Sequence, residues 1–199
     1  HLRSALRPSK GLLAEATRLQ AVAGVKGTGS AGLARAAFEA VVSRVREPSG
    51  DIWSSHAART WDSGRGHAAI ALLSMLRALG FTAGLLLVNP LELERDSARV
   101  FNGEDYPEAI VRVILSDGQR LWLDPSRRPA LFDHLPPNLR GRPFWSFDEG
   151  VTPRKGQSPK GTAGSDELSV DIDCGRRCQV RVRARGSQKR WVDARLLGE

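Results

Sequence analysis

Residues 67–80 read His67-Ala-Ala-Ile-Ala-Leu-Leu-Ser-Met-Leu-Arg-Ala-Leu-Gly80 and form the most apolar long segment of the chain. Apolar side chains fall on most sides of the helix that this run would make, so it predicts a central, buried helix. Gly80 is the expected C-terminal stop, because glycine readily adopts the left-handed conformation that ends a helix. A fold built around this segment must surround it with other elements.

Two further helices precede this segment. Residues 12–22 carry apolar side chains at helical spacing, and glycines over 24–29 interrupt the pattern. Ser30 is a suitable N-cap for a second amphipathic helix, which runs to about Val45 before Pro48-Ser49-Gly50. Residues 51–66 lack a clear period and are predicted to be a loop.

Strands follow the central helix. Ala83–Val88 reads as a buried strand, 89–105 as a polar surface loop, and 108–115 with 120–124 as a hairpin around Ser116-Asp-Gly-Gln119. A two-residue Asp-Gly turn would set Val113 opposite Trp122. A bulged turn with Gly118 in the left-handed region instead puts Val111, Val113, Leu121 and Leu123 on one face, and the hydrophobic pattern favours it.

The rest of the chain divides by composition. Residues 125–147 are rich in Pro and Arg and suggest an extended wrapping segment, and 150–166 has the composition of a flexible linker. Residues 167–197 alternate like short strands. We therefore expect an α+β domain over 1–149, in which a central buried helix packs on an antiparallel sheet, then a linker over 150–166 and a small all-β extension over 167–199.

Three anchors occur in a recognisable order: Ala71-Leu-Leu-Ser-Met-Leu-Arg-Ala-Leu-Gly80, Glu108-Ala-Ile-Val111 and Leu121-Trp-Leu-Asp-Pro125. With the stretch Leu135-Pro-Pro-Asn-Leu-Arg-Gly-Arg142 that follows them, they resemble the bacterial transglutaminase-like superfamily, whose fold is papain-like. The resemblance covers about residues 10–145. Members of that family use a Cys at the start of the central helix, a His opening the next strand and an Asp closing the hairpin.

This resemblance aligns Arg65 with the nucleophile, Glu108 with the His and Asp124 with the Asp of the family's triad. Arginine stays protonated and cannot act as a nucleophile, and the domain contains no cysteine. The resemblance therefore implies a pseudoenzyme with a degenerate triad. We expect Arg65 to pair with Glu108 or Asp124, because charges brought together there need partners.

Other chemistry at this place has less support. His67 could act as a base, but as a lone histidine at a helix start it is better explained as a structural residue. A Ser63–His67 dyad lacks the strand-turn-helix context of a nucleophile elbow. Glu108, Asp124 and His67 do not have the spacing of a metal motif, so neither a metal nor a cofactor is expected.

The resulting hypothesis is a binding or scaffolding module that keeps the former substrate cleft as a groove. Its candidate groove residues are Trp53, Trp61, His67, Arg112 and Trp122. Its partner would be a protein or peptide, or a cell-wall or other polyanionic polymer, and no motif for specific nucleic-acid binding is present. A residual hydrolase or transferase, and polyanion binding through the basic C-terminal tail, are the alternatives.

Charge and cysteines bear on the compartment. The chain carries a formal net charge of +8, more than half of it in residues 151–199, and no apolar run is long enough to span a bilayer. Cys174 and Cys178 flank a three-residue loop between strand-like segments, so a disulfide across the hairpin and two reduced thiols are both possible. Together with the family resemblance, a disulfide would indicate a protein of the bacterial cell envelope, the periplasm or the extracellular space. A cytoplasmic location remains an alternative.

Overall fold

The structure is a computed structural model that describes residues 2–24, 29–48, 51–90, 101, 103, 106–148, 153–160, 167–174, 178–185 and 191–197. Side chains are described up to residue 160, apart from 47 and 48. The helices are α1 (Leu2–Ala5), α2 (Lys10–Ala23), α3 (Ala31–Arg44), α4 (Ala57–Ser63), α5 (Ala68–Ala78) and the 3-10 turn η3 (Pro137–Leu139). Within the described chain, no helix has the length and apolar character that crossing a bilayer requires.

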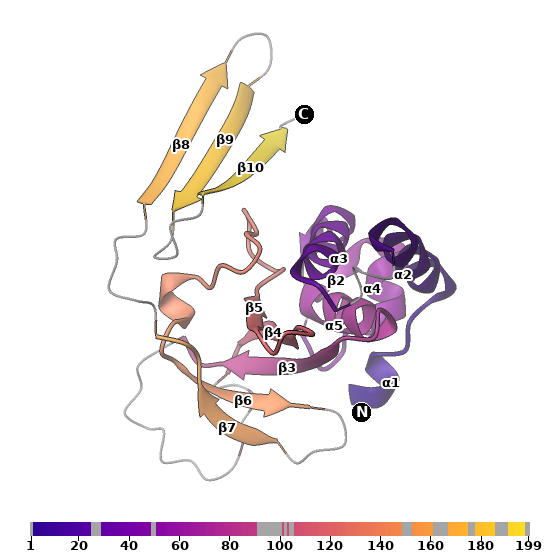
Figure 1. Cartoon of the computed structure of the whole chain (residues 1–199). Helices are drawn as coiled ribbons and strands as arrows, with labels where there is room; N and C mark the ends of the chain where they lie inside the picture. The colour runs from indigo at the N-terminus through magenta and orange to yellow at the C-terminus, as the bar shows by residue number, and fades with distance from the viewer. Residues whose placement is uncertain are drawn as a thin grey trace.

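The main sheet is antiparallel and five-stranded, with the order β5-β4-β3-β6-β7. Its strands are β3 (Thr82–Val88), β4 (Glu108–Ile114), β5 (Arg120–Leu123), β6 (Pro143–Phe147) and β7 (Arg154–Gln157). Two short strands, β1 (Glu47–Pro48) and β2 (Arg65–Gly66), pair in parallel beside the helices. The fold is thus α+β, with helices α2, α3, α4 and α5 gathered on one side of the sheet (Figure 1).

Helix α5 is the centre of the hydrophobic core. Every residue from Ala68 to Leu76 is buried, and α5 contacts α2, α3, α4, β3 and β4. Ser9 and Ser30 each accept a hydrogen bond from the backbone three residues on, and so begin α2 and α3. Gly80 has a φ of 82°, which explains why glycine follows the helix.

The two faces of the sheet have different partners. Val111, Val113, Leu121 and Leu123 face the helices and belong to the core around α5. The alternate residues, among them Leu86, Val88 and Ile110, form a second cluster with Leu135, Leu139 and Phe144. The segment after β5 therefore wraps around to cover the side of the sheet that faces away from the helices.

The hairpin has the bulged register that the hydrophobic pattern favours. Val113 lies opposite Leu121, Val111 lies opposite Leu123, and Gly118 has a φ of 82°. The side chain of Asp117 accepts a hydrogen bond from the backbone of Gln119 at 2.9 Å. The sequence pattern also predicted α2, α3, α5 and β3 in approximately the residue ranges that the structure shows.

Two segments differ from the sequence-based expectation. Residues 57–63, expected to be loop, form α4, because Ala57, Thr60 and Trp61 bury one side of a helix too short to show a clear period. Residues 154–157, expected to be linker, form β7 along the edge of β6. A Cβ on Gly156 would lie 2.6 Å from Cζ of Phe144, so this glycine serves close packing rather than flexibility.

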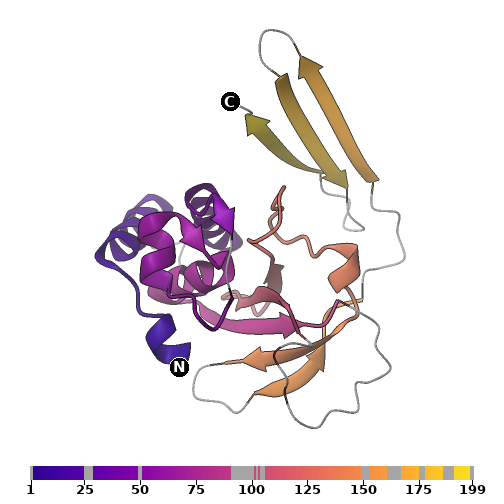
Figure 2. The ribbon, with the colours of Figure 1, turned by 180° about the vertical axis from the view of Figure 1, so that it is seen from behind.

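The last three strands form a second antiparallel sheet of order β10-β9-β8, made of β8 (Glu167–Cys174), β9 (Cys178–Arg185) and β10 (Trp191–Leu197). In Figures 1 and 2 these strands stand apart from the helical layer. Cys174 and Cys178 are cross-strand partners at the hairpin end. Their sulfur atoms lie outside what the structure describes, so the disulfide stays a prediction.

Candidate functional site

Glu108 and Asp124, which the sequence resemblance aligns with two of the triad positions, share one arginine. Arg127 Nε donates to Oδ2 of Asp124 at 3.2 Å, and Arg127 Nη2 donates to Oε1 of Glu108 at 3.2 Å. Asp124 directly follows β5, and the backbone N–H of Ser126 donates to its Oδ1 at 3.1 Å. Both carboxylates are therefore engaged by residues of the segment that follows the hairpin.

The side chain of Asp124 is buried in the protein interior and is only 4% exposed. Burial raises the pKa of its carboxyl group, and the nearby Glu108 acts in the same direction. The Ser126 N–H and the Arg127 guanidinium lower that pKa but do not outweigh burial. The ion pair thus offsets part of the cost of holding a carboxylate here.

Arg65 lies elsewhere. It is exposed, it forms β2, and its register partner is Glu47 of β1. The cation that contacts Glu108 and Asp124 is Arg127, so the sequence-based pairing identified the wrong arginine. The reason is the sheet: Glu108 and Ile110 alternate onto the face away from α5, whereas Arg65 precedes the start of that helix.

His67 is the N-cap residue of α5 but makes no side-chain capping hydrogen bond. Its backbone N–H donates to Oγ of Ser55 at 3.3 Å, which ties the start of α5 to the segment before α4. Within the described chain its Nδ1 is buried and has no hydrogen-bond partner. Burial lowers the pKa of the ring, and the carboxylate of Asp51 opposes this. The neutral imidazole is favoured.

The other groove candidates do not come together. Trp61, a residue of α4, is 8% exposed and packs in the core around α5. Trp122 lies on the far face of the sheet, with its ring centroid 5.7 Å from that of Phe144. Arg112 is paired there with Asp148 at 2.9 Å. Among the five groove candidates, only Trp53, which is 39% exposed, presents a large aromatic surface on the helical side.

Trp53 is part of an aromatic cluster that sequence reasoning missed. Its ring centroid lies 5.9 Å from that of Phe101 and 5.7 Å from that of Phe147, both nearly edge-on. Phe101 in turn contacts Tyr106 and Trp145. We call these five residues the Trp53 cluster. The alternation in Phe144-Trp145-Ser146-Phe147 was the available signal, since residues 145 and 147 share one face of a strand.

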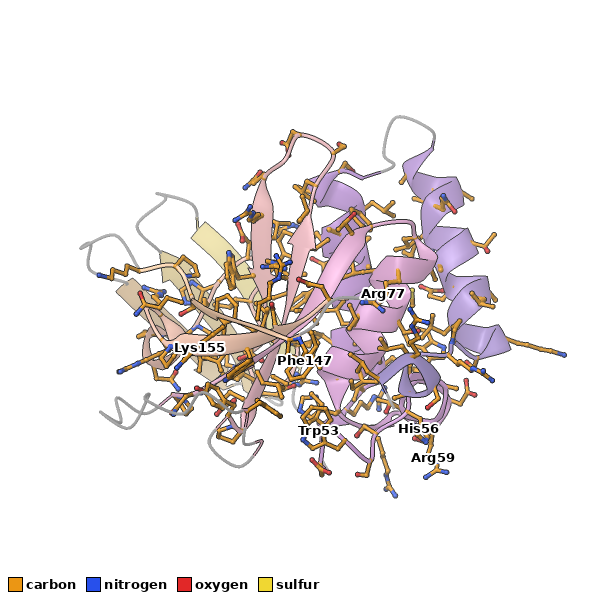
Figure 3. All side chains as sticks on the ribbon, turned by 90° about the horizontal axis from the view of Figure 1, so that it is seen from below. Trp53, His56, Arg59, Arg77, Phe147 and Lys155 are labelled. Carbon is orange, nitrogen blue, oxygen red and sulfur yellow. The ribbon has the colours of Figure 1, made fainter. Side chains whose placement is uncertain are left out.

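Basic residues lie around the Trp53 cluster. Figure 3 shows Trp53 beside Phe147, with His56 and Arg59 of the α4 region farther along the same side. Lys155 of β7 is the cross-strand partner of Trp145, and both Arg59 and Lys155 are exposed. Arg77, also labelled there, donates to the backbone carbonyl of Ala83 and so joins α5 to β3. An aromatic centre with a basic rim suits contact with a polypeptide.

Comparison with protein-family models, with curated proteins and with solved structures finds no match for this chain. In the described part of the chain, no three His, Cys, Asp or Glu side chains are grouped so that they could hold a metal ion.

Proposed function

We propose that this chain is a transglutaminase-like domain that has lost its catalytic triad and serves as a protein- or peptide-binding module of a bacterial envelope protein. The three sequence anchors support the family, and a central helix packed on an antiparallel sheet is the architecture that the resemblance implies. The only cysteines of the chain are Cys174 and Cys178, both far along the sequence from Arg65.

The observation that carries the loss of catalysis is the contact of Arg127 with Glu108 and Asp124. In an active member, the residue at position 108 is the base that must deprotonate the nucleophile. The residue at position 124 must orient that base. Here both are carboxylates, and both are held by one guanidinium at 3.2 Å. A fixed ion pair of this kind offsets part of the cost of burying Asp124 and leaves no base poised for a nucleophile.

Binding is supported by the position of the Trp53 cluster. Trp53 lies two residues before Ser55, whose hydroxyl accepts the hydrogen bond from His67 at the start of α5. In the family that this chain resembles, the substrate cleft lies at the start of the central helix. A partly exposed tryptophan held between other rings is preorganised, and such residues dominate the binding energy at protein interfaces.

The basic tail gives less support to polyanion binding. Strands β8, β9 and β10 contain four arginines and four carboxylates: Arg181, Arg183, Arg185 and Arg195 against Glu167, Asp171, Asp173 and Asp193. Glu167 is the register partner of Arg185, and Asp171 is that of Arg181. Opposite charges at facing positions favour each other, which reduces the attraction for an external polyanion.

Two measurements test this proposal. Transamidation, peptide hydrolysis and glutamine deamidation by the purified chain should all be absent, and turnover that persists after both cysteines are changed to serine would disprove the loss of catalysis. For binding, a displayed peptide library is selected on the wild-type chain and its winners are measured on Trp53→Ala. Affinity should fall roughly 30-fold, as for a loss of about 2 kcal/mol.

The matched control for binding is Leu13→Ala, because Leu13 is also an exposed large apolar residue, 45% exposed on α2. It should leave the affinity of the selected peptides unchanged. Peptides that bind Trp53→Ala as tightly as the wild type would show that the binding surface lies elsewhere, whatever the outcome of the activity assays.

A further inference from the structure

Trp53 presents both an apolar ring and an unused hydrogen-bond donor. The residue is 39% exposed, and its ring rests against those of Phe101 and Phe147. A Cβ on Gly103 would lie 3.2 Å from its Nε1, so a glycine lets the backbone approach this edge of the indole. That N–H makes no hydrogen bond with any residue that the structure describes. It can therefore donate to a carbonyl or carboxylate of a partner.

Cations lie on two sides of the Trp53 cluster. Arg59 is exposed on α4, and its guanidinium has no ion pair or hydrogen bond within the described part of the chain. Lys155 is exposed on β7 and lies opposite Trp145, so the two share a face of the sheet. Figure 3 shows Trp53 and Phe147 between Lys155 on one side and Arg59 on the other. A polypeptide crossing the cluster would thus pass a cation on each side.

Two carboxylates that lie close to the cluster in the sequence are engaged elsewhere. Burial lowers the pKa of the His67 ring, and Asp51 opposes this effect, so the carboxylate of Asp51 acts on the start of α5. Asp148 is held by Arg112 at 2.9 Å. This pair lies on the face of the sheet away from the helices, where Asp148 occupies the space beside Gly84. The described charged side chains that flank the aromatic cluster are therefore cationic.

The same features disfavour two other kinds of ligand. The rings of Phe101 and Phe147 meet that of Trp53 at 69° and 75°, so they pack on one another and do not form the walls of a cage for a quaternary ammonium group. Arg59 and Lys155 would also repel a cation. An uncharged apolar segment would cover the rings but would make no use of the two cations.

We propose that the Trp53 cluster binds an acidic segment of a partner polypeptide, in which one apolar side chain lies against Trp53 and carboxylates on either side of it meet Arg59 and Lys155. This inference rests on the proposed binding function and adds the chemistry of the partner. The apolar contact supplies most of the affinity, because a held tryptophan is a typical anchor of protein interfaces. The exposed cations select acidic partners and speed their association.

The first test uses a fluorescein-labelled peptide of about nine residues, which spans roughly 30 Å when extended. It has one leucine in the middle and glutamates on both sides. In anisotropy titrations with the whole chain, it should bind about tenfold tighter than a peptide with glutamine in place of every glutamate. Replacing the leucine with serine should weaken binding by a similar factor. Equal binding of the glutamate and glutamine peptides would overturn the proposal. Undiminished binding of the serine peptide would also overturn it, because attraction to net charge alone would then suffice.

Substitutions in the chain locate the contact. Arg59→Gln and Lys155→Gln should each weaken binding of the glutamate peptide about threefold, the effect of one exposed charge pair, and leave the glutamine peptide unaffected. Arg154→Gln is the matched control, because Arg154 is also exposed on β7 but lies opposite Ser146, on the other face of the sheet. This variant should bind like the wild type. Equal losses for Arg154→Gln and Lys155→Gln would overturn the assignment of the peptide to this face.

Selection from a displayed peptide library separates this inference from the proposed function on which it rests. Winners that require Trp53 and carry Asp or Glu around an apolar residue would support both. Winners that require Trp53 but are neutral or basic would overturn the acidic partner and leave the binding function in place. Winners that bind Trp53→Ala as tightly as the wild type would overturn both.

Discussion

Arg127 Nη2 lies 3.2 Å from Oε1 of Glu108, although nineteen residues separate the two along the chain. The same guanidinium also reaches Asp124, and the two carboxylates differ in environment: Glu108 is 35% exposed and Asp124 is 4% exposed. Water competes with the first contact but hardly with the second. The structural value of Arg127 therefore lies mainly in its contact with Asp124.

Truncating Arg127 tests this directly. Arg127→Ala should lower the free energy of unfolding by about 1–3 kcal/mol, because the buried carboxylate of Asp124 loses its cation. The measurement is urea denaturation near neutral pH. Arg120→Ala is the matched control, since Arg120 is an exposed arginine of β5, and it should change stability by less than about 0.5 kcal/mol. Equal effects of the two substitutions would remove the structural role given to Arg127.

The segment around Arg127 also shows where sequence reasoning reached its limit. The alternation of apolar residues in the hairpin was enough to select the bulged register, because the other register would have split the buried set. The partner of Asp124 could not be obtained in this way. It depends on the path of residues 125–128, and no periodic pattern encodes the course of a loop with one proline and two arginines.

The same limit applies to the Trp53 cluster. Trp53 was identified as a candidate from its residue type, but the rings that hold it come from residues 101, 145 and 147. Residues 145 and 147 belong to β6, which pairs with β3, a contact between segments about 60 residues apart. Central elements with strong periodicity were predictable, while edge strands and aromatic contacts depended on tertiary packing.

Asp124 should give stability a recognisable pH dependence. Burial raises the pKa of its carboxyl group above the ordinary value of 3.8, so the native state holds this proton more tightly than the unfolded state does. Its contribution is therefore most favourable below about pH 3.8 and is lost as pH rises through the higher native pKa. The free energy of unfolding of the wild type, minus that of Asp124→Asn, should fall as pH rises from about 3.8. A difference that is constant or rises over that interval would contradict the raised pKa.

Replacing two of the glycines with alanine should change the stability of the chain in opposite directions. Gly156→Ala would bring a Cβ within 2.6 Å of the buried Phe144 ring and should destabilise the chain by about 1–3 kcal/mol. Gly32→Ala lies in the first turn of α3, with its nearest neighbour 3.8 Å away, and should stabilise by roughly 0.5 kcal/mol. Thermal denaturation of both variants is the measurement. A neutral Gly156→Ala would mean that β7 does not pack on Phe144.

The two cysteines offer a test of the compartment argument. Cys174 and Cys178 are cross-strand partners at the end of the β8–β9 hairpin, so a bridge between them would close a very short loop. In protein exported to an oxidising compartment, alkylation without reduction followed by intact-mass measurement should find both thiols blocked. Because the loop is short, reduction should cost only about 1–2 kcal/mol of stability. Two alkylated thiols per chain would exclude the bridge.

Placing a cysteine at position 65, which the family resemblance aligns with the nucleophile, should not produce catalysis. Arg65→Cys, in a background with Cys174→Ser and Cys178→Ser, would have an accessible thiol, since Arg65 is exposed. However, the base that deprotonates this thiol would have to be the residue at position 108, and that residue is a glutamate paired with Arg127. Position 65 lies in β2, away from both carboxylates, so neither residue 108 nor residue 124 is placed to activate a thiol there. We expect no incorporation of a fluorescent amine into a glutamine-containing protein.

The control for this variant is Arg59→Cys in the same background, because Arg59 is an exposed arginine on the neighbouring helix α4. The two thiols should react with iodoacetamide at rates that agree within about threefold, and with the same rise toward the ordinary thiol pKa near 8.5. A thiol at 65 that reacts much faster at neutral pH would reveal a base or a positive field that the structure does not place there. Amine transfer by that variant would go further and show that only the nucleophile had been lost.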